Sequence, residues 1–191
     1  MKIGVLALQG AFKEHIEIFT RIGARAFQVK LAEDLEGLDG LVIPGGESTT
    51  IGKLAVSYDL VSPLRRFAER KAVWGICAGM ILMAKRIDCD QPRLGIMDMS
   101  VSRNAFGRQI DSFETGVTVH GLSNDTSTPF PAVFIRAPKV IETWGEAGVI
   151  ARVDAQTIVA VRQHKHLATA FHPELTDDPR LHQYFLRLAQ A

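Results

Sequence analysis

The feature that most constrains the fold is a regular alternation of apolar runs and amphipathic segments in the first half of the chain. Residues 3–8 (IGVLAL) are continuously apolar and end at Gln9-Gly10, a pattern typical of a strand buried on both faces. Residues 12–22 carry apolar side chains at helical spacing, and Gly23 ends this predicted helix. The same reasoning predicts strands at residues 26–29, 40–43 and 72–76, and helices after a cap at Ser48, near Pro63 and over residues 78–86. This alternation predicts a parallel sheet with helices on both faces.

The second half of the chain shows a different pattern, in which short strands follow one another with turns between them. Strands are predicted at residues 117–119, 132–135, 148–153, 157–161 and 167–171, and a final helix over about 178–189. They would be antiparallel additions to the first sheet or a small second sheet. We find no repeat and no linker, so we expect one α/β domain over residues 1–191.

Composition restricts the possible partners. The chain has 22 basic and 21 acidic residues and is 47% apolar, which is typical of a globular protein and provides no basic surface for nucleic acid. Its two cysteines, Cys77 and Cys89, form neither a disulfide framework nor a zinc motif. The first apolar run is too short to span a membrane and lacks a signal-peptide cleavage site. We therefore expect a cytoplasmic protein that binds small molecules and other proteins.

The most informative motif is Gly75-Ile76-Cys77-Ala78-Gly79, which follows a buried strand and begins a helix. This is the setting of a nucleophile elbow, where glycines flank a residue with a strained backbone. The partial positive charge of the helix N-terminus favours the thiolate form of a cysteine. The alternative is a buried structural cysteine between two incidental glycines.

A thiolate that attacks a carboxamide needs a base and a group that orients the base. His172 and Glu174, in Phe171-His172-Pro173-Glu174, directly follow an apolar strand and are the best candidates. Taken alone, an exposed turn with a hydrogen-bonded histidine would be the favoured interpretation of this segment, and the elbow reverses that preference. Pro44-Gly45-Gly46 also follows a strand, and its glycines could bring a backbone amide near a ligand. The amides of Gly46 and Ala78 could together form an oxyanion hole, although Pro-Gly-Gly is also an ordinary turn.

These three motifs, in this order, resemble the class I (triad) glutamine amidotransferases. The resemblance implies a flavodoxin-like three-layer α/β fold and a catalytic triad of Cys77, His172 and Glu174. Other stretches resemble one branch of this family, the glutaminase subunits of pyridoxal 5'-phosphate synthases. These stretches are residues 7–10, 44–50, 103–109, 111–114, 134–138 and 171–175. The block over 103–114 is the specific part, because other triad amidotransferases lack it. Small departures at Ile76, Met80 and Ala105 remain compatible with the chemistry.

The resemblance implies that L-glutamine is hydrolysed to L-glutamate and ammonia through a thioester on Cys77. It implies glutamine contacts at Gly46, Glu47, Ser48, Arg103, Ile135 and Arg136, with Arg103 a candidate partner for the α-carboxylate. Gln9 matches a position that couples the oxyanion hole to partner docking. The ammonia would pass to a separate synthase subunit in a multi-subunit complex, and no cofactor or metal ion is expected. We also expect the Gly45–Gly46 peptide to be mobile or misoriented without that partner.

Three other interpretations stay open at this point. The glutaminase could supply a different acceptor synthase, the fold could be a non-catalytic binding module, or the elbow could belong to a cysteine peptidase or chaperone. The intact set Cys77, His172 and Glu174 argues against the last two. Among the other histidines, His15 and His120 are predicted to be ordinary surface residues. His164 and His166 are predicted to be solvated rather than metal ligands, because no third ligand is evident.

Overall fold

The first half of the chain folds as the predicted alternation of strands and helices. The structure is a computed structural model that describes residues 1–103, 112–122 and 128–191. Its N-terminal elements are β1 (Lys2–Leu6), α1 (Phe12–Arg21), β2 (Arg25–Val29), the 3-10 helix η1 (Ala32–Leu35), β3 (Gly40–Ile43), α2 (Ser48–Ser57), α3 (Val61–Ala68), β4 (Ala72–Ile76) and α4 (Ala78–Met83). The strands predicted at residues 40–43 and 72–76 are confirmed to the residue.

The second half contains mostly strands. Its elements are β5 (Ala84–Ile87), β6 (Met97–Ser102), β7 (Ser112–Val117), β8 (Phe130–Ile135), β9 (Lys139–Thr143), β10 (Gly148–Arg152), β11 (Ile158–Gln163), β12 (His166–Thr169), the 3-10 helix η2 (Pro173–Leu175) and α5 (Arg180–Gln190). The expected alternatives are both present: antiparallel strands extend the main sheet, and β7 pairs with β8 in a separate two-stranded sheet.

The main sheet has the strand order of a flavodoxin-like fold in its parallel part. The order is β2-β1-β3-β4-β12, and the pairings among these five strands are parallel. The sheet continues through β11, β9, β6 and β5, with β10 on β11. The carboxyl ends of β1, β3, β4 and β12 lie at one edge, where ligands bind in open α/β sheets. The elbow, the glycine turn and His172 therefore approach one another.

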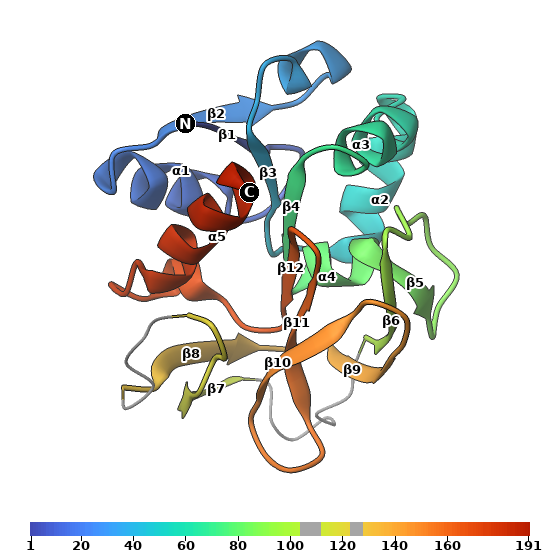
Figure 1. The fold of residues 1–191 in the computed structure, drawn as a ribbon. Helices are drawn as coiled ribbons and strands as arrows, with labels where there is room; N and C mark the ends of the chain where they lie inside the picture. Colours follow the sequence, from blue (N-terminus) through green and yellow to red (C-terminus); the bar gives the residue numbers. More distant parts are fainter. Residues whose placement is uncertain (104–111, 123–127) are drawn as a thin grey trace.

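Helices cover both faces of the parallel strands (Figure 1). α1 and α5 lie together on one face, and α2, α3 and α4 lie on the other. Trp74 on β4 points to the first face, with its ring centroid 5.6 Å from that of Phe185 on α5. Gly75, the next residue, points to the second face against α4. This three-layer arrangement confirms the fold expected from the sequence.

The helix predicted over residues 78–86 is too long, because α4 ends at Met83 and β5 begins at Ala84. Every residue of α4 is buried, so a helix that continued would carry Lys85 and Arg86 into the same layer. In extended conformation both side chains are exposed, and β5 pairs in parallel with β6.

Several smaller predictions also need correction. The strand predicted at residues 117–119 is the end of β7, followed by an isolated bridge from Val119 to Ala151. β6 and β9 were not predicted. Ser48 is the first residue of α2, and its cap is Glu47, whose carboxylate accepts a hydrogen bond from the Thr50 N–H at 2.7 Å.

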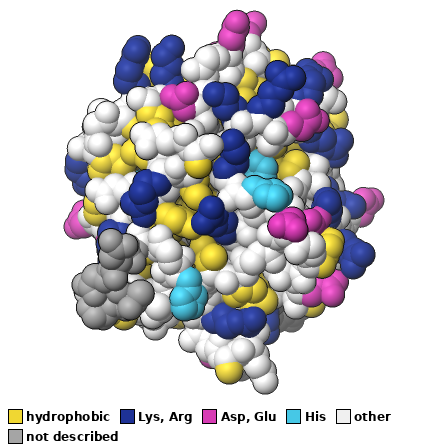
Figure 2. All heavy atoms as spheres, viewed as in Figure 1, with side chains coloured by type: hydrophobic (Ala, Val, Ile, Leu, Met, Phe, Trp, Pro, Cys, Tyr) yellow, Lys and Arg dark blue, Asp and Glu magenta, His cyan; other side chains and the backbone are white. Residues whose placement is uncertain are grey.

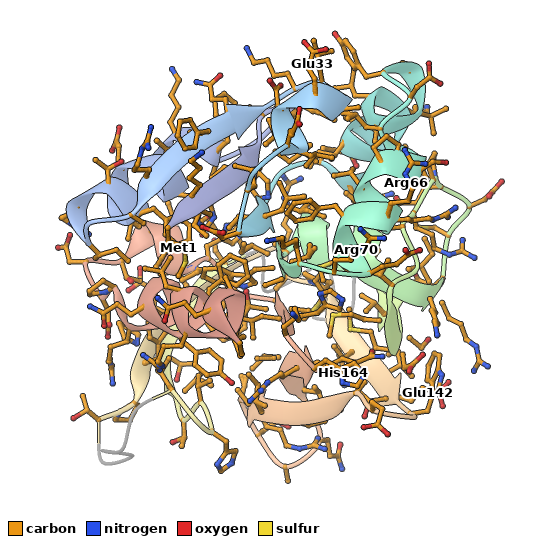
Figure 3. All side chains as sticks on the ribbon, turned by 45° about the horizontal axis from the view of Figure 1, so that its top comes forward. Met1, Glu33, Arg66, Arg70, Glu142 and His164 are labelled. Atoms are coloured by element: carbon orange, nitrogen blue, oxygen red, sulfur yellow. The ribbon has the colours of Figure 1, made fainter. Side chains whose placement is uncertain are left out.

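The surface carries charges of both signs. On the face drawn in Figure 2, basic and acidic side chains are interspersed rather than gathered by sign. Figure 3 brings forward the end where η1 lies beside α3, with Glu33 on η1, Arg66 on α3 and Arg70 just after it. Within the described ranges, no helix combines the length and the apolar character needed to cross a bilayer.

Candidate active site

Cys77 lies in a strained turn between β4 and α4. Its φ of 49° is unusual for a residue with a side chain, and its N–H donates to the Thr169 carbonyl of β12 at 2.8 Å. Its carbonyl accepts from the Ile81 N–H at 3.2 Å, which begins α4. The backbone is therefore held on both sides of the thiol, as the elbow motif predicts.

The two glycines of the elbow permit close contact between helix and sheet. A Cβ atom on Gly75 would lie 2.5 Å from the backbone of Gly79, and a Cβ atom on Gly79 would lie 2.1 Å from the Ile43 carbonyl oxygen. Both distances are far below van der Waals contact, so only glycine fits. A side chain at either position would clash with the backbone of the neighbouring element, which accounts for the glycines that flank Cys77.

His172 follows β12 and lies beside the elbow. Its N–H donates to the Val133 carbonyl of β8 at 2.8 Å, and its Nδ1 lies 2.7 Å from Oε1 of Glu174. Burial alone would lower the pKa of His172, but hydrogen bonds to Cys77 and Glu174 raise it to about 10. The ring therefore lies between the Cys77 sulfur and the Glu174 carboxylate, and both of these groups favour its protonated form.

The glycine turn after β3 packs directly against this histidine. A Cβ atom on Gly45 would lie 2.4 Å from Cε1 of His172. The Gly45 carbonyl accepts from the Ala11 N–H at 3.1 Å. Because the carbonyl and N–H of one peptide unit point in opposite directions, the Gly46 N–H points away from Ala11. The expected mobility of this peptide, and the oxyanion-hole role of Gly46 and Ala78, stay predictions.

Gln9 joins the first loop to the glycine turn. Its Oε1 accepts from the Glu47 N–H at 2.7 Å, and a Cβ atom on Gly46 would lie 2.4 Å from the same oxygen. The side chain of Gln9 therefore fixes the backbone that follows Gly46. Its predicted coupling to a partner stays a prediction.

One cavity of about 320 Å³ brings the predicted residues together. It is lined by Gln9, Gly46, Glu47, Ser48, Cys77, Ala78, Ile81, Arg103, Ile135, Arg136 and His172. Every predicted catalytic or glutamine-contact residue except Glu174 lines it, and Glu174 is buried directly behind His172. Ile81 is the one lining residue that was not predicted.

Two arginines give the cavity its positive charge. The guanidinium of Arg103 donates to Oε1 of Glu47 at 2.6 Å and to Oγ1 of Thr49 at 2.9 Å. Arg136 has a φ of 42° and forms no ion pair with any described residue. Of the block predicted as specific, residues 104–111 lie outside the described residues.

A model of the SNO glutamine amidotransferase family matches residues 5–191. The chain belongs to the SNO glutamine amidotransferase family. Two relatives are named pyridoxal 5'-phosphate synthase subunit PdxT. The one from Pelotomaculum thermopropionicum is 54% identical and covers 97% of this chain and 94% of the relative. The one from Moorella thermoacetica is 53% identical, with coverage of 98% and 99%.

Solved structures agree with this assignment. A glutamine amidotransferase crystal structure is 50% identical, covers 99% of both chains and has a TM-score of 0.92. The structure of PurLQS from Thermotoga maritima covers 97% of both chains, with a TM-score of 0.72 at 15% identity. That second similarity shows the fold alone. The first supports an enzyme that acts on glutamine.

This amidotransferase contains a supporting residue that sequence reasoning missed. Gln91 is buried, and its Oε1 accepts from Ser48 Oγ at 3.0 Å, from Thr49 Oγ1 at 3.2 Å and from Arg103 at 3.4 Å. It therefore holds Ser48 and Arg103, which line the cavity, together with the neighbouring Thr49. The sequence gives no signal for it, because a glutamine in a polar loop looks solvated.

Two further histidines lie behind the triad. The prediction that His15 is a surface residue is wrong: its exposure is 0%, and its Nε2 lies 3.4 Å from Oε2 of Glu174. His182 on α5 is equally buried and lies 3.0 Å from His15. A signal for His15 was present, since it falls between Phe12 and Phe19 on the apolar stripe of α1.

The remaining histidines lie away from the cavity. His120 and His164 are exposed, as predicted. His166 is buried, against the prediction, and its Nδ1 lies 3.3 Å from the Val73 N–H; burial lowers its pKa to about 4. Among the described residues, no group of three or more His, Cys, Asp or Glu side chains could hold a metal ion.

Proposed function

We propose that this chain is the glutaminase subunit of a pyridoxal 5'-phosphate synthase. It hydrolyses L-glutamine and passes the ammonia to a synthase subunit within a multi-subunit complex. The family assignment and the relatives named as subunits of that synthase support the proposal. The single observation that carries the chemistry is the contact of Cys77 and Glu174 with one histidine ring, His172, at a cavity of about 320 Å³.

The proposed reaction begins with Cys77 as the nucleophile. The thiolate attacks the carboxamide carbon of glutamine, and the N–H groups of Gly46 and Ala78 stabilise the oxyanion. His172 then donates its proton to the leaving nitrogen, and ammonia departs to leave a glutamyl thioester. The neutral His172 next takes a proton from water, which attacks the thioester and releases glutamate. Glu174 keeps the ring in one orientation throughout.

The proposed recognition of glutamine uses the other end of the cavity. Arg103 and Arg136 face the α-carboxylate, and Glu47 faces the α-ammonium group. Ser48 and Ile135 complete the contacts expected in the family. We place this single amidotransferase domain in the cytoplasm, because its free thiols at Cys77 and Cys89 need a reducing compartment.

The test is glutamate release from glutamine, measured with and without the cognate synthase subunit. We expect the partner to stimulate release and Cys77→Ala to abolish it, a loss of at least about 10⁴-fold in kcat. Cys89→Ser is the matched control, because it changes the other cysteine, and it should keep the parent rate. Release that this synthase does not affect would assign the glutaminase to another acceptor. No release under any condition would favour a non-catalytic binding module.

A further inference from the structure

The carboxylate of Glu174 continues into two buried histidines on the side away from the cavity. His15 comes from α1 and His182 from α5, the two helices that lie together on one face of the sheet (Figure 1). Nδ1 of His15 lies 3.0 Å from Nε2 of His182, and Nε2 of His15 lies 3.4 Å from Oε2 of Glu174. Five polar side chains therefore form one line, which runs from Cys77 through His172, Glu174 and His15 to His182.

The atoms without a hydrogen bond along this line are informative. Within the described part of the chain, Oε2 of Glu174, Nε2 of His15 and Nδ1 of His182 are buried and have no hydrogen-bond partner. Nε2 of His15 is an ionisable nitrogen within 4.0 Å of that carboxylate oxygen. A buried carboxylate oxygen without a donor is costly, so the favoured place for the ring proton of His15 is this nitrogen, where an N–H rather than a lone pair faces the carboxylate.

The protonation of His15 then determines that of His182. If a neutral His15 carries its proton on Nε2, its Nδ1 is an acceptor and needs a donor. Nε2–H of His182 is that donor, and Nδ1 of His182 is left as a bare acceptor. The opposite arrangement places the Nε2 lone pair of His15 against the carboxylate. It also leaves the Nδ1–H of His182 buried without an acceptor. An unpaired buried N–H costs more free energy than an unpaired buried acceptor nitrogen.

Both rings are neutral in this environment. Burial is the main cause that lowers the pKa of His15, and it lowers the pKa of His182 well below the usual value. Trp74 holds the two rings in place, with ring centroids 5.8 Å and 5.1 Å away in edge-on geometry. The rings therefore have fixed positions and one favourable pair of tautomers.

We propose that His15 is a positioning residue that donates from Nε2 to Oε2 of Glu174, and that His182 sets its tautomer by donating to Nδ1. The contact fixes the rotation of the carboxylate, so that Oε1 faces Nδ1 of His172. This inference rests on the proposed glutaminase function, since Glu174 orients the histidine of that reaction. His15 touches neither substrate nor reacting atoms.

The first test is the tautomer itself, measured in the unaltered full chain by two-bond ¹⁵N–¹H NMR correlation of the histidine rings. We expect both His15 and His182 to be neutral with the proton on Nε2. A proton on Nδ1 of His15 would overturn the proposal. This measurement needs no activity, so it still decides on the histidines if the chain releases no glutamate and the proposed function fails.

The second test is kinetic, in complex with the cognate synthase subunit. His15→Phe keeps a ring of similar size beside Trp74 but removes the donor. We expect kcat to fall about 10- to 100-fold, as when outer partners of metal-bound histidines are removed, with KM within about twofold. His15→Gln restores a donor and should recover a large part of kcat. His182→Phe should lower kcat less and shift His15 towards the other tautomer.

The matched control is His120→Phe, which makes the same change at an exposed site and should leave kcat unchanged. If folded His15→Phe retains the parent kcat, His15 does not position Glu174. If His15→Gln is as slow as His15→Phe, the histidine acts by packing and the proposal is wrong. Should His15→Phe not fold, the tautomer measurement and the His15→Gln kinetics decide.

Discussion

The two sides of the cavity are built in different ways. The proposed reaction side (Cys77, His172 and Glu174) is buried, with exposures of 7%, 8% and 6%. The proposed recognition side is more open at Glu47, Arg103, Ile135 and Arg136, and the side chains of Glu47 and Arg103 are 46% and 33% exposed.

The difference lies in what holds each side. Backbone geometry fixes the reaction side, through a positive φ at Cys77 and glycines in contact with neighbouring backbone and ring atoms. Hydrogen bonds between side chains fix the recognition side, with Arg103 bonded to Glu47, Thr49 and Gln91. The chemistry is therefore a property of the fold, whereas recognition depends on contacts that a ligand can exchange.

The largest effect should come from adding one methyl group on the reaction side. Gly79→Ala places a Cβ atom 2.1 Å from the Ile43 carbonyl oxygen, which forces α4 away from β3. We expect the free energy of unfolding to fall by about 3 kcal/mol or more, measured by urea denaturation. Gly148→Ala is the control, because its nearest atom would be 3.8 Å away, and it should change stability by less than about 0.5 kcal/mol. Equal effects of the two substitutions would contradict a backbone-fixed reaction side.

A smaller effect should appear in the pH dependence of stability. The pKa of His172 is raised to about 10 in the folded chain, against 6.5 as its ordinary value. The folded chain therefore binds this proton more tightly, so the stabilisation is complete below pH 6.5 and is lost as the pH rises through about 10.

The comparison needed is between the parent chain and His172→Gln in urea denaturation from about pH 6.5 to 10. The full pKa shift would correspond to about 4 kcal/mol over this range, and we expect the difference in free energy of unfolding to shrink by about half of that, about 2 kcal/mol, because solvent screens part of the interaction. On the recognition side, the difference between the parent and Arg136→Gln should stay constant. A constant difference for His172→Gln as well would show that the imidazolium does not contribute to stability.

The smallest effect should come from the recognition side. Arg103→Lys replaces the guanidinium group, which contacts both Glu47 and Thr49, by a single ammonium group. We expect KM for glutamine to rise about tenfold while kcat stays within about twofold, in steady-state glutamate release. Arg93→Lys, an exposed change outside the cavity, should alter neither constant. A large loss of kcat in Arg103→Lys would mean that the two sides are not separable.

The sequence predicts the parallel part of the fold well, for a physical reason. Strands buried on both faces read as continuous apolar runs, so residues 40–43 and 72–76 are recognisable without any partner. β9 is harder, because only one of its five residues is buried and its pairing comes from β6, far along the chain. The end of α4 at Met83 depends on the buried layer around the helix and on the pairing of β5 with β6, and neither can be recognised from the adjacent sequence.

The site follows the same rule. Cys77, His172 and the glycines carry local signals, and the resemblance supplied the glutamine contacts. His15, His182 and Gln91 reach their hydrogen-bond partners only when distant parts of the chain pack together, so only the folded chain reveals them. His15 was misjudged because its polar side chain was given more weight than its position on an apolar stripe.

The ion pair between Arg103 and Glu47 has a consequence for how glutamine enters. Free glutamine is a zwitterion, so its carboxylate can take the place of Glu47 on Arg103 while its ammonium group takes the place of Arg103 on Glu47. Binding is then an exchange of charge partners that leaves the net charge of the cavity unchanged. Added salt screens both arrangements alike, so KM should vary little with ionic strength, and a steep rise of KM with salt would rule out the exchange.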